Sequence, residues 1–484
     1  MSNILSFDVG TTAMKCILFD DDFNELFYLN KEYSLNTKSN GIAELDADIY
    51  FNTFCECIKD MSKGGIDISS ISAVVFTTQG ETLIPVDKNG NPLSPAIVWL
   101  DTRAEEEALY IKSQISRCDM YKKTGLCDID GALPAAKLLW FYKNKPQIYN
   151  DTFKFLLLED YLIYKLTGKF VSEKSLQSST GWYDIVNDTL YDDIIRICNI
   201  DTDKLPEILP CGTIVANADT SFGFSENTVV ITGAMDQISS AVAVGNIKEG
   251  VFTETTGTAL VVGVTTQKPV FDMDNPVTIY RHFDDKFIYI PYMNTAGMAL
   301  KWFKDTIMPY AAKEGEHYGI SDYGYIDRQA ESSPAGSNGV IMLPHLSEKG
   351  AFLGLNLATR ACDMARSVLE GVAYMLRSIT EMIEKKNINI QEIYSLGGGS
   401  YSRIWCKIKA DVCKKNIVRI NYAQTTALGA AVLASVAVGK YASVEDALKK
   451  CKITGEKISP EESNFAVYDE GYKKYQTYLL KTEE

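Results

Sequence analysis

Two segments about half a chain apart share one unusual pattern: a β-rich run, a turn that combines glycine with threonines, and a second β-rich run. The first occupies residues 4–19, where apolar runs flank the turn Asp8-Val9-Gly10-Thr11-Thr12. The second, Val251–Val264, is built around Thr255-Thr256-Gly257-Thr258. Each segment predicts a β-hairpin. Their recurrence favours a duplicated architecture over a tandem array, because no fixed short period links them.

The turn of the first hairpin has the composition of an anion site. Gly10 lets the backbone approach a ligand closely, and successive N–H groups in such a turn form an anion-binding concavity. Thr11, Thr12 and Lys15 add hydroxyl donors and a positive charge, and Asp8 offers a carboxylate to Mg²⁺ or its water shell. An ordinary hairpin with a polar turn would contain the same residues. The second hairpin favours the other interpretation, a pair of clamps that hold nucleotide phosphates between two halves of the chain.

Composition narrows the class of protein. The chain has 484 residues, enough for two or three domains, and a net charge of −15 from 48 basic and 63 acidic side chains. That charge disfavours a nucleic-acid or anionic-membrane surface, whereas a small phosphorylated ligand needs only a local positive pocket. Only three histidines occur, so carboxylates are the expected general bases.

Cysteine usage and the N-terminus bear on the compartment. The 11 cysteines are odd in number and lack metal-ligand spacing, which favours reduced thiols and a cytoplasmic location. The chain runs directly into a strand-like segment, so we expect no signal peptide. No apolar run approaches the roughly 20 residues of a membrane span.

Strand-like and helix-like segments alternate, which predicts an α/β class. The predicted strands of the first half are 4–7, 16–19, 25–33, 71–77 and 84–87, and its predicted helices are 47–61, 102–116, 134–143 and 160–165. A short apolar strand at 229–233 and a helix of small residues at 238–244 close this half. The second half is predicted to contain the helices 361–386, 402–413 and 425–438 and the strand 393–396.

Asp236 lies where a predicted strand gives way to a helix, a position from which a side chain can project into a cleft. A carboxylate there can accept the proton of a hydroxyl that attacks a phosphoryl group. The simpler alternative is that Asp236 only caps its helix, a common role of aspartate.

Two further clusters have polar groups suited to ligands. Gly397-Gly398-Gly399 follows a strand and precedes a helix, so its backbone can lie against a planar or phosphate ligand. Gln79-Gly80-Glu81 and the stretch Trp99 to Arg103 supply an amide, carboxylates, a guanidinium and an indole, which are groups that grip polyhydroxylated molecules. Trp99 taken alone is more often a core residue than a sugar platform.

These segments together resemble the FGGY family of carbohydrate kinases, within the superfamily that also contains actin. The resemblance spans nearly the whole chain in family order. It is carried by Phe7–Thr12, Pro95–Arg103, Gly233–Gln237, Thr256–Thr258, Leu343-Pro344 with Gly354-Leu355, Ala365–Gly371, Gly397–Gly399 and Ala427–Ala431.

The resemblance implies an α/β fold of two ribonuclease-H-like (actin-like ATPase) domains that flank a deep catalytic cleft. Residues 1–246 would form the N-terminal sugar-binding domain and residues 247–484 the C-terminal ATP-binding domain. The implied activity is ATP-dependent phosphorylation of a sugar hydroxyl, with ATP and Mg²⁺ as cofactors. The implied partner is a small sugar or polyol, and neither a nucleic acid nor a membrane is an expected partner. The resemblance leaves open whether the chain forms a homodimer.

The resemblance also assigns roles to single residues. Asp236 matches the catalytic base, and Asp8 matches the carboxylate on the metal side. The matches to the sugar pocket and its support are Gln79, Gly80, Glu81, Asp101, Arg103 and Gln237. The matches to the ATP site are Thr11, Thr12, Lys15, Thr256, Gly257, Thr258, Gly398, Gly399 and Ser402.

The substrate is less clear, because the chain departs from two familiar patterns. Glycerol kinases carry Arg-Glu, and xylulokinases Met-His, at the pair that matches Gly80-Glu81. The segment Gly397–Trp405 is more similar to xylulokinases. We therefore expect a xylulokinase-like enzyme that acts on a pentulose such as xylulose. The alternatives are a kinase for glycerol or another polyol and a non-catalytic sensor, and the presence of Asp236 argues against the sensor.

Overall fold

The computed structural model describes residues 3–38, 41–347, 349–451, 453 and 455–483. The chain divides into two compact units. The first comprises Met1–Ile247, Gln267–Ile288 and Gln424–Lys452, and the second comprises Lys248–Thr266, Tyr289–Ala423 and Ile453–Glu484. Across the described part of the chain, no helix combines the length and apolar character needed to span a bilayer.

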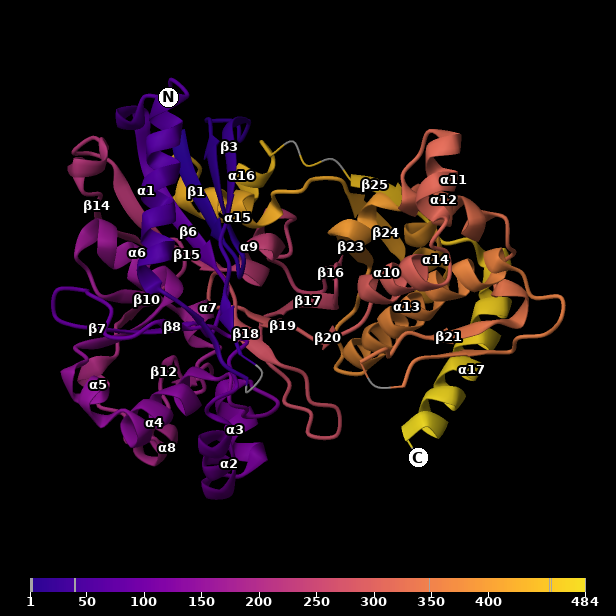
Figure 1. The fold of residues 1–484 in the computed structure, drawn as a ribbon, viewed down its shortest axis with the longest axis horizontal. Helices are drawn as coiled ribbons and strands as arrows, with labels where there is room; N and C mark the ends of the chain where they lie inside the picture. Colours follow the sequence, from indigo (N-terminus) through magenta and orange to yellow (C-terminus); the bar gives the residue numbers. More distant parts are fainter. Residues whose placement is uncertain (1–2, 39–40, 348, 452, 454, 484) are drawn as a thin grey trace. The chain divides into compact units, whose positions relative to one another are not determined.

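The first unit is built on a six-stranded mixed sheet in the order β14-β15-β6-β1-β2-β3 (Figure 1). Its strands are β1 (Asn3–Val9), β2 (Ala13–Phe19), β3 (Glu25–Glu32), β6 (Ile71–Thr78), β14 (Ile214–Asn217) and β15 (Val229–Met235). Strands β1 and β2 form the predicted antiparallel hairpin, and β1, β6 and β15 run parallel. The hairpin prediction is confirmed, with β1 extending through Asp8 to Val9.

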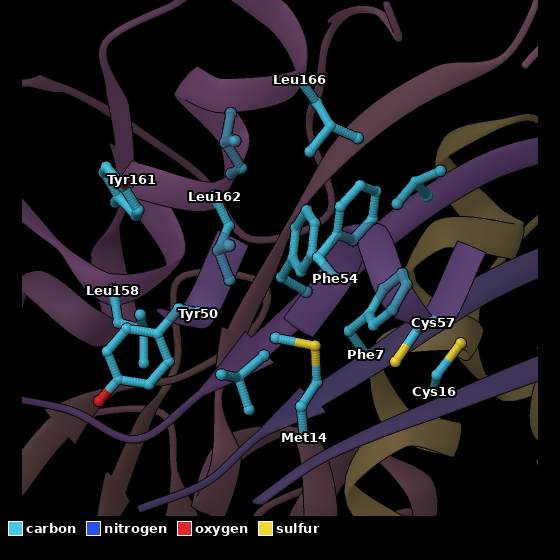
Figure 2. Packing of buried hydrophobic residues seen from close by; sticks show 14 of the residues in the cluster. Phe7, Met14, Cys16, Tyr50, Phe54, Cys57, Leu158, Tyr161, Leu162 and Leu166 are labelled. Carbon is cyan, nitrogen blue, oxygen red and sulfur yellow. The ribbon is translucent and has the colours of Figure 1, made fainter. Parts of the chain in front are cut away.

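One face of this sheet is closed by helices α1 (Ala47–Lys63) and α6 (Leu158–Thr167). Phe7 of β1 packs against Phe54 of α1, with ring centroids 5.0 Å apart (Figure 2). Because side chains alternate along a strand, Ser6 and Asp8 point to the opposite face from Phe7.

That opposite face is covered by helix α15 (Thr425–Ala437), which reaches it from near the end of the chain. In Figure 1 the yellow ribbon of α15 lies among the indigo strands, and Ser6 Oγ donates a 2.8 Å hydrogen bond to the carbonyl of Ala427. Helix α15 also packs on α9 (Asp236–Ala243). Gly429 makes this contact possible, because a Cβ there would lie 1.7 Å from the carbonyl oxygen of Ser239.

The second unit contains strands β17, β16, β23, β24 and β25, hydrogen-bonded in that order. They span Leu260–Thr266, Phe252–Thr256, Glu392–Leu396, Asn416–Ile420 and Gly455–Ile458. Strands β16 and β17 form the second predicted hairpin, and β16, β23 and β24 run parallel. Each unit therefore places a hairpin beside two parallel strands, which confirms the predicted duplication. The long helix α13 (Ala361–Glu384) and α14 (Arg403–Cys413) belong to this unit.

The remaining elements complete the α/β class. The other α-helices are α2 (Glu105–Gln114), α3 (Arg117–Thr124), α4 (Pro134–Asn144), α5 (Pro146–Asp151), α7 (Lys174–Gln177), α8 (Asp192–Ile197), α10 (Gly297–Thr306), α11 (Ala311–Tyr318), α12 (Asp322–Glu331), α16 (Val444–Leu448) and α17 (Phe465–Glu483). A second sheet of the first unit has the order β4-β5-β8-β7-β9, from Asn36–Thr37, Ala43–Leu45, Ala96–Ile97, Leu83–Val86 and Lys154–Leu157. Three strand pairs are β10 with β13 (Val171–Glu173, Glu207–Leu209), β11 with β12 (Tyr183–Asp184, Thr189–Leu190) and β21 with β22 (Ile341–Leu343, Ala351–Leu353). The short strands β18 (Ile279–Arg281), β19 (Phe287–Tyr289) and β20 (Tyr292–Met293) complete the set.

Candidate functional site

The parallel strands of the first unit bring the predicted catalytic residues to one edge of the sheet. Asp8 lies opposite Thr77 in the β1–β6 register, and Thr77 lies opposite Ala234 in the β6–β15 register. A 2.7 Å hydrogen bond from Thr77 Oγ1 to the carbonyl of Ala234 ties the two strands together. Asp236 follows Ala234 by two residues, so it lies at the same edge as Asp8. The carboxyl ends of parallel strands are where α/β folds place ligands.

Asp236 is the first residue of α9, and Met235 occupies the N-cap position. The Asp236 carboxylate accepts a 2.6 Å hydrogen bond from the backbone N–H of Gln237. Asp236 therefore does not occupy the N-cap position considered above, although its carboxylate accepts one N–H of the first turn. Burial and, to a lesser extent, the nearby Asp8 carboxylate together raise the pKa of Asp236 to about 7. A carboxyl group with that pKa is suited to accept a proton near neutral pH.

Asp8 and Lys15 form an ion pair of 2.9 Å across the hairpin. Within the described residues, no group of three or more His, Cys, Asp and Glu side chains is arranged to hold a metal. Magnesium is commonly bound through one or two carboxylates together with substrate phosphates and water, and does not need a complete protein cage. Asp8, which is close enough to Asp236 to raise the pKa of that carboxyl group, fits that mode of binding.

A chain of hydrogen bonds connects the first hairpin to the strand end that bears Gln79. Trp99 Nε1 donates to Thr11 Oγ1 at 2.9 Å, and Thr11 Oγ1 donates to Gln79 Oε1 at 2.7 Å. Gln79 Nε2 in turn donates to the hydroxyl of Tyr50 at 3.4 Å. Trp99 is 39% exposed, so it is not the core residue that its type alone suggests. Thr12 is exposed at the turn.

The pair Gly80-Glu81 is held in a tight space. A Cβ at Gly80 would lie 3.1 Å from Met235 Sδ, so this position has little room for a larger side chain. Glu81 adopts a left-handed backbone conformation with φ of +64°, which is rare for a residue other than glycine. Burial raises the pKa of Glu81 to about 7, while the charge of Lys137 opposes the rise.

Lys137 is a member of this cluster that sequence reasoning missed. It lies in α4 and is fully buried, and its ammonium donates to the carbonyls of Glu81 at 2.9 Å and Val98 at 3.0 Å. Burial lowers the pKa of Lys137 to about 8, although Glu81 opposes the fall. Nothing in the sequence separates this lysine from the other lysines on predicted helices.

Asp101 and Arg103, predicted to support the sugar pocket, form an ion pair with each other. Arg103 donates from Nε and Nη2 to the two carboxylate oxygens of Asp101, at 2.8 and 2.7 Å, and from Nη2 to Glu44 at 2.7 Å. Asp101 is fully buried and also accepts the backbone N–H of Ala43 at 2.7 Å. Such a bidentate pair fixes the geometry of the surrounding loop. Gln237, the last predicted residue of the sugar pocket, follows Asp236 in the first turn of α9.

The second unit contains a cavity of about 550 Å³. Six predicted ATP-site residues line it, namely Thr256, Gly257, Thr258, Gly398, Gly399 and Ser402. The structure thus brings together the second hairpin, the glycine loop and the start of α14. Sequence reasoning missed the lining residues of α10 and α12, which include Met298, Leu300, Lys301, Tyr323 and Asp327, and Trp405 of α14 also lines the cavity. A mostly apolar cavity with a few polar groups is typical of a small-molecule site.

Ser402 links the two sides of this cavity. It is the N-cap of α14, where its hydroxyl accepts the backbone N–H of Trp405 at 3.1 Å. The same hydroxyl donates to Asp327 Oδ1 at 2.8 Å. Burial raises the pKa of Asp327 to about 6.

Comparisons with known proteins agree with this geometry. Residues 3–243 match the N-terminal domain of the FGGY family of carbohydrate kinases, and residues 254–438 match its C-terminal domain. A xylulose kinase of Staphylococcus xylosus is 26% identical over 99% of both chains. A gluconokinase of Bacillus subtilis is also 26% identical, over 92% of this chain and 89% of its own. The crystal structure of a ligand-bound xylulose kinase from Lactobacillus acidophilus has the same fold, with a TM-score of 0.90 at 24% identity over 99% of this chain and 98% of that one.

Proposed function

Because the chain belongs to the FGGY family of carbohydrate kinases, we propose that it transfers the γ-phosphoryl group of ATP to a hydroxyl of a neutral ketose. The proposed preferred acceptor is a pentulose such as xylulose. The observation that carries the proposal is the placement of Asp236. Its carboxylate lies at the edge where three parallel strands end, beside Asp8, and has a pKa of about 7. The cytoplasm, where ATP is available, is the proposed compartment.

In this mechanism the oxygen of the acceptor hydroxyl attacks the γ-phosphorus of ATP, and Asp236 accepts the proton of that hydroxyl. The deprotonated form of Asp236 is the active one. Asp8 would hold Mg²⁺, which offsets the charge of the transferring group when it is bound. Lys15, paired with Asp8, contributes a positive charge at the same strand end.

The nucleotide is proposed to bind in the cavity of the second unit. The apolar and aromatic side chains of Leu300 and Trp405 would contact the nucleoside, and the exposed turn at Gly257 and Thr258 would face the phosphates. Thr11 and Thr12 are proposed to hold phosphate from the first hairpin.

Electrostatics favours a neutral acceptor over an aldonate such as gluconate. The largest charge that acts on Glu81 is that of Lys137, and two further acidic groups, Asp130 and Asp236, also act on it. Arg103 is already paired with Asp101 and Glu44. An anionic acceptor would meet the like charges of Glu81, Asp130 and Asp236, whereas the hydroxyls of a neutral sugar can donate to these carboxylates.

The test is an assay of ATP consumption with a panel of acceptors: xylulose and other pentuloses, hexuloses, glycerol, other polyols and gluconate. We expect the highest kcat/KM with a pentulose and the lowest with gluconate. Highest activity with glycerol would instead favour the polyol kinase alternative. Binding of sugar and ATP with no turnover for any acceptor would favour a sensor, and preference for gluconate would contradict the electrostatic argument.

A further inference from the structure

A fully buried ion pair lies beneath the second hairpin. The ammonium of Lys409, on α14, is 2.6 Å from Glu254 Oε1, on β16, and neither side chain is exposed to solvent. Ser395 Oγ also donates to this carboxylate. A buried ion pair is a poor source of stability, because the desolvation of two charges offsets most of their attraction. The contacts of the pair therefore indicate a role other than stability.

The pair holds the side chain of Thr256. The hydroxyl of Thr256 donates to Glu254 Oε2 at 2.7 Å and accepts from Lys409 Nζ at 2.9 Å. Thr256 is only 1% exposed, whereas Gly257 and Thr258 at the turn are exposed. The hydroxyl of Thr256 thus points to the ion pair, and the next two residues present the hairpin to the cavity.

Thr256 in turn supports the glycine loop. A Cβ at Gly399 would lie 2.6 Å from Thr256 Cβ, so the loop rests directly on the threonine. A Cβ at Gly397 would likewise lie 3.0 Å from Thr255 Cγ2. Any shift of Thr256 must therefore move both segments that line this side of the cavity.

Lys409 reaches a third wall of the same cavity. Its ammonium lies 5.0 Å from the ring centroid of Trp405, within the range of a cation–π contact. The indole of Trp405 lines the cavity, and its Nε1 donates to the carbonyl of Leu369 at 3.1 Å. One ammonium group is thus in contact with the hairpin, through Thr256, and with the aromatic wall.

We propose that Lys409 and Glu254 are positioning residues that set the second hairpin for the phosphates of the nucleotide. This inference rests on the proposed binding of ATP in this cavity. The charge of Lys409 is matched by Glu254, and its donors are engaged by Glu254 and Thr256, so the lysine acts through Thr256 and does not touch phosphate. A network whose members are all hydrogen-bonded fixes one arrangement of the groups around it.

The experiment compares ADP with adenosine, because only ADP depends on a correctly placed phosphate hairpin. Dissociation constants are measured by calorimetry on the full chain, for the unmodified protein and for Lys409→Met. We expect Lys409→Met to weaken ADP binding about 10- to 100-fold, the scale of an ångström-sized misplacement, and to weaken adenosine binding by a clearly smaller factor, because methionine can still pack against the ring of Trp405. Equal losses for the two ligands, or no loss for ADP, would overturn the proposal.

Glu370→Gln is the matched control. Glu370 and Arg366 form another buried ion pair of the second unit, 2.8 Å apart, and neither lines the cavity. This variant is expected to lower stability without changing the ratio of the ADP and adenosine constants. A change of that ratio as large as in Lys409→Met would count against a specific role for Lys409.

Thr256→Val and Thr256→Ser give the same test without leaving a buried charge unpaired. The valine retains the ion pair and removes the hydroxyl that joins it to the hairpin, so it should lose ADP affinity selectively, while the serine should retain it. These two variants decide the question if Lys409→Met does not fold. An unmodified protein that binds no ADP would instead refute the nucleotide assignment itself.

Discussion

Asp8 and Lys15 lie directly opposite each other on β1 and β2, and their side chains form a 2.9 Å ion pair. The two residues act on the pKa of Asp236 in opposite directions, because the carboxylate of Asp8 raises it and the ammonium of Lys15 lowers it. The hairpin therefore tunes the proposed base as well as offering groups to phosphate and metal.

The pH dependence of turnover should report this tuning. Since Asp236 works in its deprotonated form, kcat/KM should fall as the pH drops through about 7. Lys15→Met removes a charge that lowers the pKa of Asp236, so it should move the acid limb to higher pH. Asp8→Asn should move it to lower pH. Profiles of kcat/KM over pH 5–9 give the measurement, and shifts in the same direction for both variants would refute the assignment.

Asp236→Asn should lower kcat by about 10² to 10⁴, the usual range for loss of a general base. Binding of ADP should not change, because the cavity proposed for it is lined by residues of the second unit. Steady-state kinetics and calorimetry on the same preparation separate the two effects. Near-normal turnover in this variant would show that another group accepts the proton.

Glu81→Gly should separate acceptor binding from stability. A left-handed conformation costs a residue other than glycine about 1–2 kcal/mol, so the change to glycine stabilises the folded backbone by that amount. The extra freedom of glycine in the unfolded chain offsets about 0.5–1 kcal/mol of this stabilisation. Loss of the carboxylate also removes the largest opposite charge that acts on the buried Lys137, so the relief of strain is read from the Tm of Glu81→Gly relative to that of Glu81→Ala, while kcat/KM for the acceptor should fall strongly.

Glu81→Ala is the control for that variant. It also removes the carboxylate, but it retains the strained backbone with φ of +64°, so its Tm should lie below that of Glu81→Gly. The KM for ATP should stay unchanged in both variants. Unchanged acceptor kinetics would place the sugar pocket elsewhere.

Gly429→Ala should destabilise the first unit, because the new methyl group would collide with the backbone of Ser239 in α9. Overpacking of this kind costs about 1–3 kcal/mol, and a shift of α9 should also reduce kcat through Asp236. Denaturant unfolding measures the loss of stability, and steady-state kinetics measure the change in kcat. Gly324→Ala is the control for stability alone, since the nearest atom there is the side-chain oxygen of Ser321 at 3.3 Å, whereas Gly324 itself lines the cavity proposed for the nucleotide. A harmless Gly429→Ala would mean that the two helices separate easily.

What the sequence predicted well depends on local pattern. Both hairpins follow from glycine and threonine turns between β-rich runs, and the helix at 47–61 follows from apolar spacing. The placement of the helix at 425–438 depends instead on long-range packing. The small residues of α15 indicate that this helix packs closely, but not that it packs against β1 and α9 of the first unit.

The candidate site was predictable to a similar degree. Six of the ATP-site residues line one cavity, yet its far wall comes from α10 and α12, which carry no motif. Two details could not be read from residue types. The hydroxyl of Thr256 is engaged by Glu254 and Lys409, and the backbone of Glu81 is left-handed. The first detail depends on Lys409, which is distant in sequence from Thr256, and the second depends on the backbone geometry of the turn.

The route of the chain through the first unit has a consequence for synthesis. A ribosome releases β1, β6 and β15 early, but α15, which covers one face of their sheet and packs against α9, emerges only after Ala423, the last residue of the second unit's long middle segment. The nascent sheet must therefore remain open while most of the second unit is made. The helix that bears Asp236 gains the support of α15 only after the middle segment of the second unit has been made, so a chain terminated before Thr425 cannot complete the surroundings of the proposed base.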